Sequence, residues 1–203
     1  MATRVATFDM VRYGMGCAAV AALAWGLLGV ADPGPVMLLA SAFLCLITCT
    51  DTLGGRIPNL VTLPLLAGAF LYHLVQSGPA GLLFALLGSL TGFALLFLPF
   101  LLLGMGGGDV KALAALGALL GPGDIFQVFL LTGLIGGLLS LLYMGTGGVL
   151  GERLQAGLAA LKTAAYCKCL PARGQGEGPR LRVPYAPAIT LGYFAFVRWG
   201  GIV

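Results

Sequence analysis

The chain has 203 residues, of which 59% are hydrophobic and only 9% are charged, with 11 Lys and Arg against 7 Asp and Glu. Soluble domains carry about 25% charged residues, so the composition excludes a soluble globular enzyme, a disordered protein and a nucleic-acid-binding module. We therefore expect an all-α, polytopic transmembrane helical bundle, whose net charge of +4 comes from basic cytoplasmic loops.

Long apolar runs follow one another along the chain and predict its spanning helices. A helix needs about 20 mostly apolar residues to cross a membrane. We expect about six spanning helices in a single membrane domain that covers residues 1–203, at 13–30, 36–50, 60–75, 81–103, 125–144 and from 185 to the C-terminus.

A shorter apolar stretch, residues 110–120, follows the fourth run. It is too short to cross a membrane alone if it is straight, and short elements are tolerated at membrane depth where protein surrounds them. This stretch is predicted to form a short helix that either spans the membrane or only dips into it.

Basic residues collect on one side of the predicted topology. Arg4 and Arg12 precede the first run, Arg56 follows the second and Lys111 follows the fourth, whereas the three short turns on the other side contain no Lys or Arg. Only Arg198, near the C-terminus, breaks this pattern. The positive-inside rule then places the N-terminus and these loops in the cytoplasm. The most basic loop, residues 148–182, is also cytoplasmic in this topology, and it contains a possible amphipathic helix along the membrane surface.

Two of the seven acidic residues stand apart from the others. Five lie in the N-terminal tail, in short turns or in the basic loop, whereas Asp51 and Asp109 each end an apolar run beside glycines. Ionisable groups at membrane depth are costly and are functional candidates. Two carboxyl groups on the same membrane face could form an aspartic-protease-type pair, in which one stays protonated while the other acts as general base. Such a pair needs no metal and no cofactor, and we expect neither.

Glycines precede the second aspartate in the run Gly106-Gly107-Gly108-Asp109. Because glycine has no side chain, Gly106, Gly107 and Gly108 would let an extended peptide approach the backbone closely. Lys111 would point away from Asp109 on a helix, and its default role is to reach the lipid headgroups.

Three further residues follow the first aspartate. Arg56 could reach the headgroups or hold the loop, Pro58 suits the first turn of the third helix, and Asn59 could form a local hydrogen bond. Spacing alone leaves paired-carboxylate catalysis and a transporter or channel equally open, because both place acidic groups in membrane cavities.

Three blocks, taken together, resemble the type IV prepilin peptidase family of membrane aspartic endopeptidases, which carry a Gly-x-Gly-Asp signature. The blocks occur in order along residues 36–192: Asp51 with Arg56-Ile57-Pro58-Asn59, then Gly106-Gly107-Gly108-Asp109-Val110-Lys111 with Ala114-Ala115-Leu116-Gly117, and finally Val183-Pro184-Tyr185-Ala186-Pro187-Ala188-Ile189 with Gly192.

The resemblance implies an endopeptidase that cuts the short basic leader from prepilins and pseudopilins at the cytoplasmic face, after a glycine and before a hydrophobic helix. Asp51 and Asp109 match the family's catalytic pair, and Gly106 and Gly108 match the glycines that shape its site. The implied partners are a prepilin or pseudopilin and the lipids of a bacterial inner membrane, with no nucleic acid. The oligomeric state stays open.

Long members of the family have two CxxC pairs in an added cytoplasmic domain and also N-methylate the new terminus. This chain has neither the pairs nor room for the insertion, so it resembles a short, peptidase-only member of the Flp or tight-adherence type. One alternative is a presenilin-like or signal-peptide-peptidase-like protease, whose first aspartate follows a tyrosine, whereas Asp51 follows Thr50. The other alternative is a non-enzymatic transporter with intramembrane carboxylates.

Overall fold

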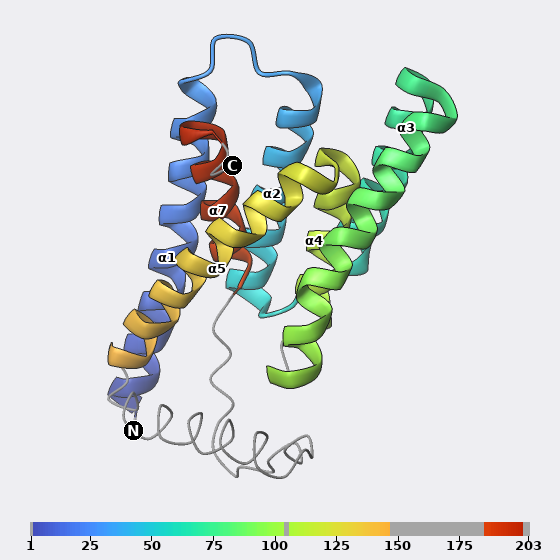
Figure 1. Ribbon diagram of the computed structural model, residues 1–203. Helices are drawn as coiled ribbons and strands as arrows, with labels where there is room; N and C mark the ends of the chain where they lie inside the picture. The colour runs from blue at the N-terminus through green and yellow to red at the C-terminus, as the bar shows by residue number, and fades with distance from the viewer. Residues whose placement is uncertain (1, 104–105, 147–184, 201–203) are drawn as a thin grey trace.

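The structure, a computed structural model, describes residues 2–103, 106–146 and 185–200. All regular secondary structure in this part of the chain is helical (Figure 1): α1 Ala2–Leu28, α2 Pro35–Gly54, α3 Asn59–Leu103, α4 Gly107–Leu120, α5 Pro122–Thr146 and α7 Ala186–Trp199. The all-α fold class is confirmed. The predicted surface helix in the loop 148–182 lies outside the described residues.

Among these residues, four helices are long and apolar enough to cross a membrane by their length and composition. The third of them, the window Asn59–Leu101 in α3, covers two of the predicted runs. The last predicted run forms α7, whose 14 residues are fewer than the about 20 that a span needs. The other three candidate spans are Met10–Leu28, Pro35–Gly54 and Pro122–Leu141.

Two helical arms, residues 59–77 and 79–103, make up α3. If straight, its 45 residues would form a rod of about 67 Å, more than twice the ~30 Å hydrocarbon core of a bilayer. Gly78 instead has φ 61° and ψ −144°, a backbone conformation that suits a residue without a side chain. The chain doubles back there into a hairpin (Figure 1), and a Cβ on Gly81 would lie 2.8 Å from the carbonyl carbon of His73.

The centre of the bundle is occupied by α4, which is buried on nearly all sides. Its residues 112–119 are all buried, while Lys111 is exposed. The second arm of α3 approaches it so closely that a Cβ on Gly88 would lie 2.9 Å from the carbonyl carbon of Gly117. With 14 residues, α4 is about 21 Å long, which is shorter than the ~30 Å hydrocarbon core. The predicted short helix therefore exists, and protein surrounds it.

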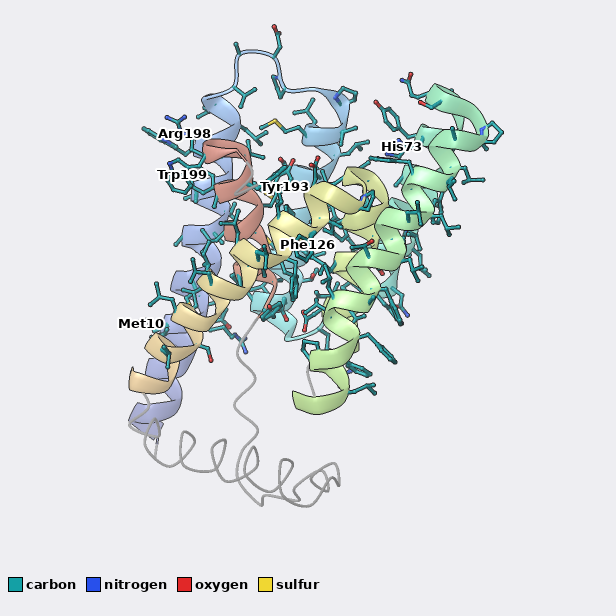
Figure 2. All side chains as sticks on the ribbon, in the orientation of Figure 1. Met10, His73, Phe126, Tyr193, Arg198 and Trp199 are labelled. Atoms are coloured by element: carbon teal, nitrogen blue, oxygen red, sulfur yellow. The ribbon has the colours of Figure 1, made fainter. Side chains whose placement is uncertain are left out.

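His73, the only histidine of the chain, lies beside one end of α4 (Figure 2). Its Nε2 donates a hydrogen bond to the carbonyl oxygen of Leu119 at 3.0 Å, and this carbonyl is one of those that a helix end leaves without an intrahelical partner. The histidine thus joins α3 to the C-terminal end of α4.

The helix ends fall into two groups (Figure 1). The N-terminus, the α2–α3 turn, the ends of α3 and α5 and the starts of α4 and α7 lie toward one end of the bundle, whereas the α1–α2 connection and the hairpin turn of α3 lie toward the other. Asp51 lies in the last turn of α2, and Asp109 lies in the first turn of α4. Both aspartates therefore belong to the first end, which we call the carboxylate end.

Candidate active site

Asp51 is held at the C-terminal end of α2. The helix stops at Gly55, whose φ of 62° is left-handed and whose N–H donates to the Asp51 carbonyl oxygen at 2.8 Å, as is common where a glycine ends a helix. The side chain turns inward and is only 7% exposed. There its Oδ2 accepts a hydrogen bond of 3.1 Å from the backbone N–H of Ala186. A buried carboxylate requires such a donor.

Asp109 lies in the first turn of α4, which begins after Gly106. The backbone of Gly106 is extended, with φ −68° and ψ 130°, and its carbonyl oxygen accepts the Asp109 N–H at 3.1 Å. A Cβ on Gly106 would lie 2.9 Å from Oδ2 of Asp109. A side chain at residue 106 would therefore displace the carboxyl group. Gly107 is less constrained, because its Cβ would meet only the Phe100 ring at 3.7 Å.

The turn after Asp51 packs directly against the start of α4. A Cβ on Gly108 would lie 3.1 Å from the Cβ of Ile57, so the glycine allows the two backbones to approach each other. Lys111 Nζ donates a hydrogen bond to Asn59 Oδ1 at 3.2 Å. The expected local partner of Asn59 is thus replaced by a lysine on another helix. The Asp51 block and the Asp109 block, which are about fifty residues apart in the sequence, are therefore neighbours in the structure.

Arg56 and Pro58 occupy the exposed part of the same turn. The Pro58 carbonyl oxygen accepts the N–H of Val61 at 3.1 Å, and the proline immediately precedes α3, which begins at Asn59. The role of Arg56 stays a prediction.

A third segment, the start of α7, also reaches this site, and sequence reasoning assigned it no role. Ala186 contributes the amide that binds Asp51. Tyr185, which precedes α7 and lies outside the candidate spans, packs its ring against Gly136 of α5, whose Cβ would be 3.3 Å from the ring. Burial and, second, the negative charge of Asp109 raise the pKa of the Tyr185 phenol. The only sequence signal was the apolar block 183–189.

A groove of about 330 Å³ runs between the two arms of α3 and α4. It is mostly apolar, with Thr62, Ser89 and Lys111 as its polar lining. Lys111 is two residues after Asp109, and at about 100° per residue the two side chains leave α4 on opposite faces. This groove therefore lies on the face of α4 that carries Lys111, and Asp109 is on the opposite face.

The arrangement is suited to chemistry by carboxyl groups. Three segments converge at the carboxylate end: the Asp51 turn, the glycine block with Asp109, and the start of α7. No group of three or more His, Cys, Asp or Glu side chains that could hold a metal ion occurs within residues 2–103, 106–146 and 185–200. Two aspartates beside glycines, one buried and hydrogen-bonded, could serve as general acid and general base.

The sequence pattern of the type IV leader peptidase family matches residues 37–141, just over half of the chain. The matched stretch runs from α2 to α5, so it contains Asp51, Asp109 and the contacts between their two blocks, but not α7. No curated protein and no solved structure matches the chain.

Proposed function

The chain belongs to the type IV leader peptidase family, and we propose that it is an aspartic endopeptidase that cleaves the basic leader of type IV or Flp-like prepilins after a glycine. The observation that carries this proposal is the packing of the Asp51 turn on the glycine block before Asp109, where a Cβ on Gly108 would lie 3.1 Å from Ile57. Two carboxylates on separate helices are thereby held at one end of a membrane bundle.

In the proposed mechanism Asp51 and Asp109 act together on one water molecule. Because two nearby carboxyl groups cannot both ionise easily, one keeps its proton. The ionised group takes a proton from the water, which adds to the scissile carbonyl carbon, while the neutral group donates its proton to the carbonyl oxygen. The C–N bond then breaks as the carboxyl group that took the proton from water donates it to the leaving amine, while the other carboxylate takes a proton back from a hydroxyl of the intermediate.

The proposed substrate is a prepilin or pseudopilin whose hydrophobic helix lies in the same membrane as the enzyme. Gly106, Gly107 and Gly108 would leave room for its extended cleavage site. The turn with Arg56, Pro58 and Asn59, together with Lys111, would border that site.

We further propose that the enzyme lies in a bacterial inner membrane, in contact with its lipids, with its N-terminus and active site on the cytoplasmic side. Since the sequence lacks CxxC pairs, the proposed activity excludes N-methylation.

Cleavage of a purified prepilin by the wild type, Asp51→Asn and Asp109→Asn tests the proposal. Each asparagine variant should lose about 10²–10⁴-fold in rate, because general acid–base catalysis contributes that much. Asp124→Asn is the matched control, since Asp124 is exposed at the start of α5, away from the carboxylate end, and this variant should cleave normally.

Near-normal cleavage by Asp51→Asn or Asp109→Asn would overturn the assignment of the pair. A wild-type protein that cleaved no prepilin but carried ions across liposome membranes would instead be a transporter. Thermal unfolding of all variants checks that lost activity does not reflect lost structure.

A further inference from the structure

The hydrogen bond between α7 and Asp51 joins a backbone amide to a carboxylate that lies inside the protein. Asp51 is 7% exposed, and the Ala186 N–H lies 3.1 Å from its Oδ2. Burial disfavours an ionised carboxylate unless donors compensate for the lost water. Hydrogen bonds to charged groups are stronger than those between neutral groups, so this amide favours the ionised form.

The local sequence explains why this amide is available to Asp51. The first N–H groups of a helix have no intrahelical acceptor. In α7 the second residue is Pro187, which has no N–H, and the N–H groups of Ala188 and Ile189 both donate to the Tyr185 carbonyl oxygen, at 3.0 and 3.1 Å. The Ala186 N–H therefore remains available to an acceptor outside the helix. It lies at the positive end of the helix dipole, which favours a negative charge.

A second bond fixes the register of α7 on α2. The hydroxyls of Thr48 and Thr190 form a buried hydrogen bond of 2.6 Å. Thr48 is about one turn before Asp51, and Thr190 is about one turn after Ala186. The Thr48–Thr190 and Asp51–Ala186 hydrogen bonds are thus one turn apart on each helix. Together they align α2 and α7 so that the amide faces the carboxylate.

On its other side, α7 is held against α5 by glycines. A Cβ on Gly192 would lie 2.8 Å from the backbone nitrogen of Thr132, and a Cβ on Gly136 would lie 3.2 Å from the Cβ of Ala188. Since α7 has partners on both sides, the position of its first amide is fixed by packing.

We propose that the backbone N–H of Ala186 is a positioning group of the peptidase site, which fixes the orientation of the Asp51 carboxylate and favours its ionised form. This inference rests on the proposed function, and it assigns a role to the block 183–189.

An amide-to-ester exchange at residue 186 tests this directly, because an α-hydroxy acid analogue of alanine removes the N–H and leaves the side chain unchanged. The matched control is the same exchange at Ala188, whose N–H donates within its own turn at 3.0 Å. The pH dependence of kcat/KM for cleavage of a purified prepilin is measured for both proteins and the wild type.

Loss of the donor should disfavour the ionised Asp51 carboxylate, so the pH below which activity falls should move upward by about one unit, equivalent to about 1.4 kcal/mol. At a pH near the acidic limb the 186 ester should be about tenfold slower than the 188 ester. In a coupled pair the lower apparent pKa belongs to both carboxyls, so ¹³C NMR of labelled aspartate, assigned with Asp51→Asn, should report the same shift for Asp51 without any turnover.

Equal pH profiles and equal ¹³C titrations for the two esters would overturn the inference while leaving the peptidase assignment intact. Absence of wild-type cleavage would overturn the proposed function, but the NMR titration would still test the amide. If the 186 ester does not fold, Thr190→Val serves as second variant, because it removes the adjacent α2–α7 bond. An unshifted acidic limb in that variant also contradicts the proposal.

Discussion

A single methyl group at residue 106 should disable the site. In Gly106→Ala the new Cβ would lie 2.9 Å from Oδ2 of Asp109, so the carboxyl group must rotate away. We expect prepilin cleavage to fall by at least about tenfold, since small displacements of catalytic groups are costly, while the thermal unfolding temperature changes little because Gly106 is exposed.

The adjacent glycine supplies the comparison. Gly107→Ala places its Cβ 3.7 Å from the Phe100 ring, an ordinary contact, and it should retain several-fold more activity than Gly106→Ala. Equal losses in the two variants would mean that the substrate backbone, and not the Asp109 carboxyl group, requires the absence of side chains in this block.

The bond between Lys111 and Asn59 should have a measurable but small effect. Both residues are exposed, and Nζ and Oδ1 are 3.2 Å apart, so the expected coupling between Lys111→Met and Asn59→Ala is about 1 kcal/mol or less. A double-mutant cycle on the free energy of unfolding measures it. Additive effects would show that the bond does not join α3 to α4.

At the scale of helices, α7 depends on a close approach to α5. Gly192→Ala would bring a Cβ to within 2.8 Å of the Thr132 backbone nitrogen and even closer to its hydroxyl, so one helix must move. We expect a loss of about 1–3 kcal/mol of stability and, because α7 then shifts, reduced cleavage. Gly137→Ala, which meets no atom within 4 Å, should be neutral in both thermal unfolding and activity.

The sequence predicted the helices well where membrane depth dictates their length. The run 36–50 became Pro35–Gly54, and 125–144 became Pro122–Thr146, because apolar residues must continue for as long as a helix lies in the bilayer. The first helix begins at Ala2 and not near residue 13. Hydropathy marks the part of a helix in lipid, whereas the backbone hydrogen bonding continues through Arg4 and Arg12.

The candidate site was predictable only through its side chains. Asp51 and Asp109 stand out because ionisable residues are rare in apolar runs. The Ala186 amide carries no such signal, since every residue except proline has an N–H. Its function depends on how α2 and α7 align. That alignment follows from packing at Gly192 and from the Thr48–Thr190 bond. Both contacts join residues that are far apart in the sequence, so no single segment predicts them.

For the whole molecule, the two groups of helix ends carry different charges. The turn at the carboxylate end contains Arg56 and the start of α4 contains Lys111, whereas the α1–α2 connection and the hairpin turn around Gly78 contain no Lys or Arg. Arg198, in the last turn of α7, is an exception at the other end (Figure 2). By the positive-inside rule, this asymmetry leads us to expect the basic end in the cytoplasm. The proposed chemistry requires the same orientation, because the basic leader of the substrate stays on that side.

Single cysteines in a background without the five native ones test the orientation. We expect Ser77→Cys, in the exposed hairpin turn, to react with a membrane-impermeant maleimide in intact spheroplasts. Arg56→Cys, exposed in the turn after α2, should react only after the membrane is permeabilised. The opposite labelling would place both aspartates outside the cytoplasm, where they could not meet an uncleaved leader, and the proposed substrate would then be wrong even if the peptidase chemistry were right.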